Sequence, residues 1–319
     1  MSTGQNIGLY INNLDTQNPT SEQLQQLQGY ATDISTSNFT TGILWALHVD
    51  ASGDFIYNGG SPMISGGQLQ NCLNDLPGLL STIKGGTVNQ LLFSIGGWSC
   101  ESDFVNIGNL INQYGTGSKN PLYQNFQALA SQLFIDGIDL DLEADSSKAP
   151  YSHPYDYYTD TVVQLTQMLN GLGLEVTYCP YTDQDFWLNC LAQVYQNNQQ
   201  QLVNWFNLQC YDGGAGNTQK EWANAIQTYG SSLGVNTPAA FVVPGYSTPD
   251  CPSTIESLFS DSQIMETGIN GGFIWNYGGI VTDQANGTCA PNNSTADYAN
   301  AIINGIAQLS NSSTLAKAT

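Results

Sequence analysis

The feature of this sequence that most constrains its fold is a regular alternation of short apolar, β-branched runs with longer amphipathic stretches. Runs of the first kind predict strands, and stretches with apolar residues three and four apart predict helices. The alternation continues from one end of the chain to the other. Eight strands are expected, at Asn6–Ile11, Thr41–Val49, Gln90–Gly96, Gly137–Glu143, Leu174–Pro180, Trp205–Tyr211, Ala240–Gly245 and Gly272–Trp275.

Helices are expected between these strands, and the first of them carries a start signal. Thr20 followed three residues later by Gln23 is the pattern of a capping box, in which the two residues satisfy free backbone N–H groups at a helix start. The amphipathic stretches predict helices at Ser21–Thr32, Gly67–Ile83, Tyr123–Leu133, Tyr155–Leu169, Glu221–Tyr229 and Asp297–Leu309.

Strand then helix, repeated about eight times in 319 residues, predicts one α/β domain, a parallel (β/α)8 TIM barrel that spans residues 1–319. A doubly wound parallel sheet has a similar alternation and is the alternative. Only a short stretch separates the last two predicted strands, so we expect no α+β insertion there.

The charge balance restricts what such a domain can bind. The chain has 26 acidic residues, five lysines and no arginine, and its formal net charge is −21. Nucleic acids, anionic membranes and phosphorylated substrates are recognised through Lys and Arg, so these partners are disfavoured. No run of about 18 apolar residues predicts a membrane span. We therefore expect a neutral substrate, no nucleic-acid or membrane partner, and a monomer.

The seven cysteines show neither the spacing of a zinc knuckle nor that of a redox pair, and we expect no metal and no cofactor. At least one of them must be unpaired within the chain. Cys251 and Cys289 are the first candidates for a disulfide, and seven reduced, buried thiols are the alternative. Residues Met1–Asn6 do not resemble a signal peptide, but a surface rich in Asn, Gln, Ser and Thr favours an extracellular protein.

One predicted strand carries acidic residues at every second position. Within Asp136–Glu143, the side chains of Asp139, Asp141 and Glu143 share one face, and the aliphatic residues between them share the other. The aliphatic face suits the helices of a barrel, so the carboxylates must point inward, with Glu143 at the carboxyl end where barrel active sites lie. Acids spaced about 7 Å apart cannot all ionise easily when partly buried. At least one should keep its proton near neutral pH and can serve as a general acid.

A calcium loop is the structural alternative for such a stretch. Calcium loops place oxygen ligands on a tight turn among polar neighbours, whereas large aliphatic residues separate the acids here. The pattern therefore favours a proton-donating site over a cation site.

This octet resembles the Asp-x-x-Asp-x-Asp-x-Glu signature of glycoside hydrolase family 18, the chitinases and related endo-β-N-acetylglucosaminidases. Three further segments fall in the family's order along the chain, so the resemblance covers nearly the whole barrel. They are Ser94-Ile95-Gly96-Gly97-Trp98, Gln209-Cys210-Tyr211-Asp212 and Gly271-Gly272-Phe273-Ile274-Trp275. The resemblance implies a retaining mechanism in which the substrate's own 2-acetamido group, rather than an enzyme carboxylate, attacks the anomeric carbon.

The resemblance also implies roles for individual residues. Glu143 protonates the leaving oxygen, Asp141 turns between Asp139 and the acetamido N–H, and Tyr211 donates to the acetamido oxygen. Trp275 forms the floor of the pocket beneath the reacting sugar. Further contacts to substrate are expected from Gln209, Asp212, Tyr10, Tyr181, Gly97 and Trp98, whereas Asp136 and Ser94 complete the motif structurally, and Trp45, Trp205, His48 and His153 are expected to be structural or surface residues.

Three functions remain open on these grounds. The first is an endo-acting chitinase that hydrolyses β-1,4-linked N-acetylglucosamine, because a barrel without the insertion should have a shallow, open groove. The second is an endo-β-N-acetylglucosaminidase that cuts the chitobiose core of N-glycans. The third is a glycan-binding barrel without catalysis, and the presence of Glu143 with both aspartates disfavours it.

Overall fold

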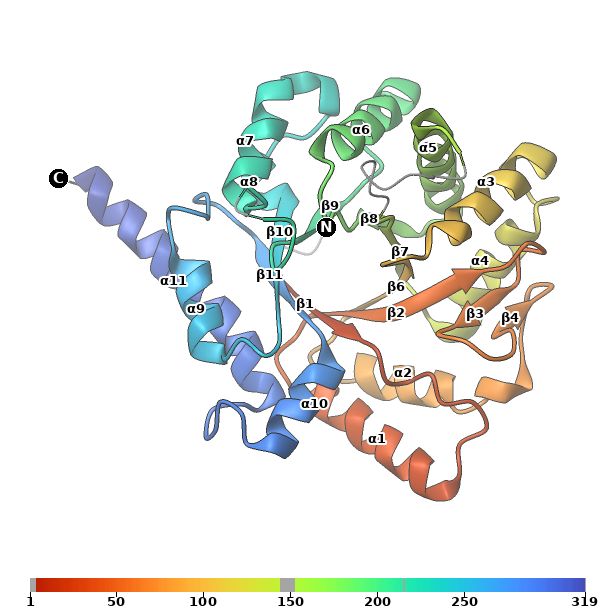
Figure 1. Ribbon diagram of the computed structural model, residues 1–319, viewed down its shortest axis with the longest axis horizontal. Helices are drawn as coiled ribbons and strands as arrows, with labels where there is room; N and C mark the ends of the chain where they lie inside the picture. The colour runs from red at the N-terminus through yellow and green to blue at the C-terminus, as the bar shows by residue number, and fades with distance from the viewer. Residues whose placement is uncertain (1–3, 144–152, 215, 319) are drawn as a thin grey trace.

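The computed structural model describes residues 4–143, 153–214 and 216–318, and eight parallel strands form a closed ring at its centre (Figure 1). Each strand pairs with its neighbours in the ring, and pairing of the first strand with both the second and the last closes it. The ring strands are β1 (Asn6–Ile11), β2 (Thr41–Val49), β6 (Gln90–Gly96), β7 (Gly137–Asp141), β8 (Glu175–Tyr178), β9 (Trp205–Gln209), β10 (Val242–Ser247) and β11 (Gly271–Trp275).

Helices surround this ring on the outside, as Figure 1 shows, so the predicted (β/α)8 barrel is confirmed. Between β10 and β11 the described chain forms one helix, α9, and no α+β insertion. The helices are α1 (Ser21–Ser35), α2 (Leu76–Lys84), α3 (Glu101–Tyr114), α4 (Pro121–Leu133), α5 (Tyr155–Gly171), α6 (Gln184–Asn198), α7 (Gln219–Tyr229), α8 (Pro238–Phe241), α9 (Pro252–Ser260), α10 (Tyr277–Asn286) and α11 (Thr295–Ala318).

The first helix begins as its capping box predicts. The Thr20 side chain accepts from the Gln23 backbone N–H, and the Gln23 side chain accepts from the Thr20 backbone N–H. These bonds satisfy two donors that the helix itself leaves free, and they fix where the chain turns from β1 into α1.

One predicted helix is wrong over its first half. Residues Gly67–Leu73 do not form the start of a helix: the segment forms part of a hairpin of β4 (Ile64–Ser65) and β5 (Gln68–Leu69), followed by a 3-10 turn, Asn71–Leu73. Gly66 and Gly67 both have positive φ, which suits a two-residue hairpin turn, and α2 starts only at Leu76, with Pro77 in its first turn. With β3 (Phe55–Tyr57), the hairpin extends the sheet beyond β2.

Strand ends differ from the prediction by a few residues. The strand predicted at Ala240–Gly245 lies at Val242–Ser247, because Pro238 starts the short helix α8 just before it. The strand predicted to reach Glu143 ends at Asp141, so Leu142 and Glu143 lie just beyond its carboxyl end.

Two apolar clusters hold the barrel together. The larger one packs the outer faces of the strands against the helices. The smaller one lies inside the ring, with Tyr10, Ile43 and Phe273 at its centre and four half-buried aromatic residues packed against it: Trp45, Trp205, Tyr211 and Trp275. The middle of the barrel is therefore filled by side chains, and open space is left at its ends.

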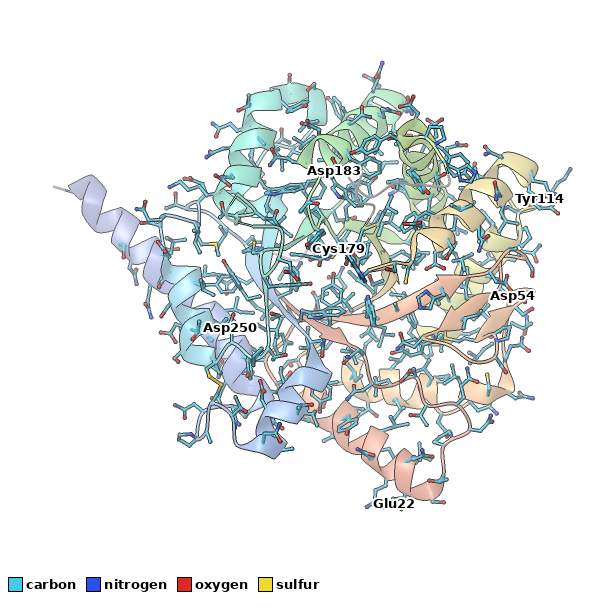
Figure 2. All side chains as sticks on the ribbon, viewed as in Figure 1. Glu22, Asp54, Tyr114, Cys179, Asp183 and Asp250 are labelled. Carbon is cyan, nitrogen blue, oxygen red and sulfur yellow. A yellow bond between two sulfur atoms is a disulfide. The ribbon has the colours of Figure 1, made fainter. Side chains whose placement is uncertain are left out.

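The predicted disulfide between Cys251 and Cys289 is present and joins the start of α9 to the loop after α10, where Figure 2 shows sulfur atoms beside the helices. The other five cysteines are free thiols, and Cys179 lies at the centre of the ring of strands (Figure 2). Within the described ranges, no helix is long and apolar enough to span a bilayer.

Candidate active site

The deepest polar group of the site is Asp139, which is completely buried inside the barrel. Alternation along β7 points its side chain inward, in register with Ser94 on β6 and Thr177 on β8. Its carboxylate accepts four hydrogen bonds, from Tyr10 (2.7 Å), Ser94 (3.0 Å), Thr177 (2.6 Å) and Asn207 (2.9 Å). Four side chains from four strands thus offset the loss of water around one carboxylate.

Asp141 and Glu143 lie above Asp139 and share one donor. The amide nitrogen of Gln209 donates to Asp141 Oδ1 (3.0 Å) and to Glu143 Oε1 (3.2 Å). The Tyr211 hydroxyl in turn donates to Gln209 Oε1 at 3.0 Å. Four of the predicted residues therefore form one connected network at the carboxyl ends of β7 and β9.

Asp141 is predicted to turn between Asp139 and a substrate, and the structure shows one of these two positions. No hydrogen bond between described residues joins the two aspartates. Asp139 already accepts four donors, so Asp141 bonds upward to Gln209 instead. Asp141 thus occupies the position that faces a substrate.

All three carboxyl groups have raised pKa values, and burial is the main cause for each. For Asp139, the hydrogen bonds from Thr177 and the other donors favour the charged form and so oppose the rise in its pKa. The pKa of Asp141 is raised well above its ordinary value, by burial first and then by the negative charges of Glu143 and Asp139. Burial and the charge of Asp212 raise the pKa of Glu143, and the Gln209 hydrogen bond opposes this. The site therefore favours a protonated carboxyl group near neutral pH.

A cavity of about 400 Å³ opens above this network. Its walls are largely aromatic, and Trp275 contacts the rings of both Tyr10 (5.3 Å between centroids) and Trp45 (5.0 Å) in edge-on geometry. The cavity is lined by Tyr10, Trp45, Trp98, Asp141, Glu143, Cys179, Tyr181, Gln209, Tyr211, Asp212 and Trp275. Nine of the predicted site residues are in this set; the carboxylates are its only charged members.

Trp98 and Tyr181 stand at the edge of this cavity, with ring centroids 6.5 Å apart. Trp98 is the most exposed large aromatic residue among those described, at 55%. An exposed aromatic ring beside a cavity is positioned to stack on the apolar face of a sugar.

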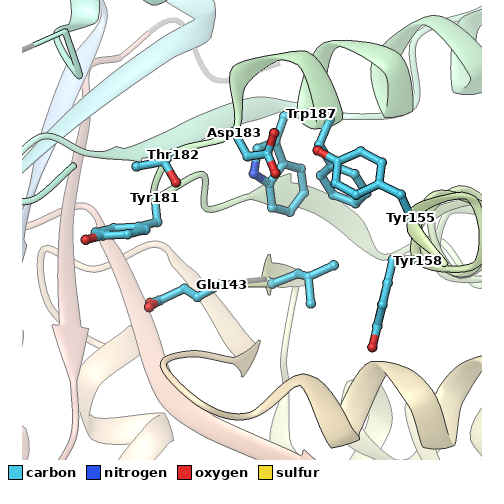
Figure 3. A pocket seen from close by; sticks show the side chains of 9 residues that line it. Glu143, Tyr155, Tyr158, Tyr181, Thr182, Asp183 and Trp187 are labelled. Carbon is cyan, nitrogen blue, oxygen red and sulfur yellow. The ribbon is translucent and has the colours of Figure 1, made fainter. Parts of the chain in front are cut away.

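A second recess lies directly behind Glu143, and Figure 3 shows Glu143 and Tyr181 on one side of it and Tyr155, Tyr158 and Trp187 on the other. Its volume of about 10 Å³ is room for one water molecule at most. The recess can therefore hold a water molecule beside Glu143, but it is too small for a sugar.

The remaining predicted residues lie below or away from the cavity. Gly97 has φ +107°, its N–H donates to the Asp141 carbonyl (2.7 Å), and a Cβ there would approach the Trp45 ring at 3.1 Å. The Ser94 hydroxyl donates to Asp139 from the neighbouring strand β6. Asp136 lies at the opposite end of β7, where both carboxylate oxygens pair with Lys84 at 2.8 Å. Asp136 therefore lies away from the cavity, and a structural role for it stays a prediction.

Sequence reasoning missed two residues of the cavity wall. Trp45 was interpreted as a core residue, but it lines the cavity, and its buried indole N–H has no hydrogen-bond partner among the described residues. Cys179 is a buried thiol that accepts from the Tyr10 hydroxyl at 3.1 Å and donates to Asp141, which lowers the pKa of Asp141. Alternation along their strands marks both as inward-facing, and this signal could have found them.

Neither a protein-family model nor a curated protein sequence matches the chain. Solved structures do match it. They include a group IV chitinase of Ostrinia furnacalis in complex with allosamidin (14% identity, 96% of this chain and 100% of that one, TM-score 0.59) and a chitinase of Chromobacterium violaceum (10%, 96% and 100%, 0.53). A third is a variant family 18 chitinase of Cycas revoluta in complex with (GlcNAc)4 (14%, 95% and 98%, 0.51). Across nearly its whole length the chain therefore has the fold of the glycoside hydrolase family 18 chitinases.

Proposed function

We propose that this protein is an endo-acting, retaining glycoside hydrolase that cleaves β-1,4-linked N-acetylglucosamine chains with help from the substrate's acetamido group. The observation that carries the proposal is the stack of Asp139, Asp141 and Glu143, with Gln209 bonded to both upper carboxyl groups. The stack is chemically asymmetric, because the lowest member is saturated by four donors and the upper two face the cavity.

Glu143 is the proposed general acid. It lies just past the end of β7, at the cavity, and burial together with the charge of Asp212 raises its pKa. A carboxyl group that keeps its proton at higher pH can protonate a glycosidic oxygen, and no water needs to enter for this step.

The nucleophile is proposed to come from the substrate. Asp141 ends β7, Glu143 follows two residues later, and both accept from one amide donor, so they lie on the same side of a bound sugar. Enzymes that use a carboxylate nucleophile need it opposite the acid. Asp141 instead suits the acetamido N–H, which it would orient. Once a proton has passed to the glycosidic oxygen, the pair of Asp141 and Glu143 carries the negative charge that stabilises the oxazolinium ion.

Tyr211 completes the proposed geometry. Its hydroxyl donates to Gln209 Oε1 and lies in the cavity wall. On binding, the same hydroxyl would donate to the acetamido carbonyl oxygen and direct it toward the anomeric carbon. Burial raises the pKa of Tyr211 well above its ordinary value, so the proton needed for this hydrogen bond stays in place.

A neutral glycan fits the rest of the cavity. Aromatic rings stack on the apolar faces of pyranoses, and amide and carboxyl groups bond to their hydroxyls. Trp275 and Trp45 supply a floor, and Trp98 and Tyr181 an open edge. Two of the structural neighbours hold allosamidin and (GlcNAc)4, which supports an N-acetylglucosamine oligomer as the ligand here. The absence of an insertion between β10 and β11 supports binding to internal positions of a chain.

The experiment that tests the proposal uses a defined oligomer, (GlcNAc)6, with mass spectrometry for product lengths and proton NMR for the anomer first released. Internal cuts and an initial β-anomer are expected. An initial α-anomer would exclude the retaining mechanism, and binding of the hexamer without any cleavage would favour a glycan-binding barrel.

The endo-β-N-acetylglucosaminidase alternative shares the same barrel residues. A high-mannose glycoprotein tested beside the hexamer separates the two functions. Cleavage of the glycoprotein alone would contradict the chitinase proposal and leave the acid and its partners unchanged.

We also propose that the protein acts outside the cell. The disulfide between Cys251 and Cys289 supports this, because disulfides persist in oxidising compartments. Fractionation of the source cells with an antibody to the protein tests the proposal, and a purely intracellular pool would contradict it.

A further inference from the structure

A cluster of three unlike side chains lies beside the cavity and takes no part in the proposed reaction. His48 is on β2, Cys100 is the residue before α3, and Asp103 is in the first turn of α3. One ligand atom from each of the three lies within 4.8 Å of the other two, and among the described residues no other His, Cys, Asp and Glu side chains are grouped so. Sequence spacing did not reveal the cluster, because His48 and Cys100 are 52 positions apart in the chain.

The cluster is held in place by its surroundings. His48 Nδ1 lies 2.9 Å from Asp103 Oδ2, and the other carboxylate oxygen of Asp103 accepts from the Val49 backbone N–H at 3.0 Å. Asp103 is buried, whereas His48 and Cys100 are both partly exposed. The Cys100 thiol donates to the Trp98 carbonyl at 3.4 Å and also has a side-chain hydrogen bond with His48. His48 and Asp103 are thus anchored on regular structure, and Cys100 already lies beside them.

We propose that His48, Cys100 and Asp103 bind a divalent metal ion of borderline softness, with zinc as the type case. Zinc takes imidazole, thiolate and carboxylate ligands in tetrahedral sites, whereas calcium and magnesium take oxygen ligands. Three protein ligands leave a fourth position, on the solvent side where His48 and Cys100 are exposed. The thiolate and the carboxylate also balance the two charges of the ion.

Little movement is needed to form this site. With zinc bonds of about 2.0–2.3 Å at tetrahedral angles, ligand atoms lie about 3.3–3.6 Å apart. The observed atoms lie within 4.8 Å, and the closest pair, at 2.9 Å, must open by a few tenths of an ångström. Side-chain rotation of Cys100 and a small shift of the His48 ring are sufficient.

Protons compete with the metal. Zinc binds a neutral imidazole and a thiolate, so affinity should increase as pH rises and protons should be released on binding.

The site would fasten the loop after β6 to strand β2. Trp98 is two residues before Cys100 and stands at the edge of the cavity. A bound ion would restrict this loop and so the position of the Trp98 ring. The importance of the Trp98 position rests on the proposed function. Metal binding itself does not, and the titration measures metal binding directly.

Isothermal titration of the chelator-treated full chain with Zn²⁺ tests the proposal, and titration with Cd²⁺ reports thiolate ligation through its ultraviolet charge-transfer band. One equivalent of each ion is expected to bind. Cys100→Ser should remove the band and weaken zinc binding at least tenfold, and His48→Gln should weaken it to a similar degree. Cys72→Ser and Cys210→Ser, which change other partly exposed thiols, should bind as the parent chain does.

Two results would overturn the proposal. One is the absence of saturable one-equivalent binding by the parent chain. The other is binding that survives Cys100→Ser but is lost in Glu143→Gln, because the ion would then sit on the cavity carboxylates. Circular dichroism of each variant in chelator establishes that the fold is intact before either result is scored. Neither outcome depends on hydrolysis, so failure here leaves the glycosidase proposal standing.

Discussion

The two ends of the barrel contain the same elementary pair, a carboxyl group bonded to a glutamine amide, in different surroundings. At the carboxyl end, Glu143 accepts from Gln209, and at the amino end, Glu175 accepts from Gln90. Burial is the main cause of the raised pKa at both. A shifted pKa therefore does not identify the acid. The carboxyl end differs in having two further buried carboxylates on the same strand and a cavity walled by tryptophan and tyrosine.

The amino end has a cavity too, and it is the larger of the two, at about 540 Å³. Its polar lining is almost entirely amides and hydroxyls, such as Asn6, Thr41, Asn89 and Asn270, with Glu175 as its one carboxylate among the residues the structure describes. Nearby, Lys84 neutralises Asp136. At the carboxyl end no lysine is among the groups that shift the pKa of Asp141 or Glu143. The carboxyl end therefore differs from the amino end because no lysine offsets the charge of its buried carboxyl groups.

The largest predicted effect compares Glu143→Gln with its counterpart Glu175→Gln. The first change keeps the shape of the side chain and removes the proton, so kcat on (GlcNAc)6 should fall about 10³-fold or more. The second makes the same chemical change at the amino end and should leave kcat within about twofold. Steady-state kinetics and calorimetric binding of the hexamer check both, with affinity retained in Glu143→Gln. Turnover near the parent rate in that variant would end the assignment of the acid.

A second matched pair is Asp141→Asn and Asp136→Asn. The first should lower kcat about 10²-fold, because the orienting negative charge is lost. It should also raise the melting temperature near neutral pH, because the folded-state pKa of Asp141 is raised and its charged form destabilises the fold.

The partner change, Asp136→Asn, should act in the opposite direction on stability. It removes the partner of Lys84 and an acceptor for the Leu91 N–H (2.7 Å), and the unfolding free energy should fall by about 1 kcal/mol with kcat unchanged. Calorimetric melting measures both variants. Equal signs for the two stability changes would show that the ends are not electrostatically distinct.

The comparison also shows what could be predicted from the sequence. Strand alternation places Asp139, Asp141 and Glu143 on one face whatever the neighbours are, and the order of strands in a barrel then brings Tyr211 and Trp275 to the same end. These relations depend on local geometry and topology alone, so they were predictable.

Other features depend on irregular local geometry. The pairing of β2 with β6 shifts register between Leu44 and Leu47, and Trp45 lies in that shift, so alternation marks Trp45 as inward-facing but does not fix its height along the barrel axis. The grouping of His48 with Cys100 depends on where a loop ends. The hairpin at Gly66–Gly67 depends on turn chemistry within an apolar stretch that otherwise has helical spacing.

The pH dependence should separate the two ends as well. A general acid works only while protonated, so activity should decline as pH rises through the raised pKa of Glu143, and the maximum should be acidic. The pair of Asp141 and Glu143 titrates together, so the profile reports the pair. Asp212→Asn removes a charge that raises the pKa of Glu143, and the alkaline limb should move to lower pH.

The control for this profile is again Asp136→Asn, since the Asp136 charge raises the pKa of Glu175 and not that of Glu143. Its alkaline limb should coincide with that of the parent chain. A maximum above about pH 8 in the parent, or an equal shift in the two variants, would contradict a protonated Glu143 as the acid.

The smallest predicted effect concerns two tryptophans, one at each end. At the carboxyl-end cavity, the buried indole N–H of Trp45 has no partner within the part of the chain that the structure describes. The Trp205 N–H donates to Asn207 Oδ1 at 2.8 Å. An unpaired buried donor is unfavourable in the free protein, so it is available to a substrate oxygen. Trp45→Phe should raise KM about 3- to 10-fold without loss of stability, because the orphaned donor disappears with it.

Trp205→Phe should do the reverse, leaving KM unchanged and lowering the unfolding free energy by about 1 kcal/mol, because Asn207 loses a donor. Asn207 also donates to Asp139, so a larger loss would mean that the hydrogen bonds around that carboxylate act together. Kinetics and denaturant titration of both variants measure these differences. An unchanged KM in Trp45→Phe would mean that the indole contributes only its ring to the cavity floor. The unpaired N–H would then destabilise the free protein without taking part in binding.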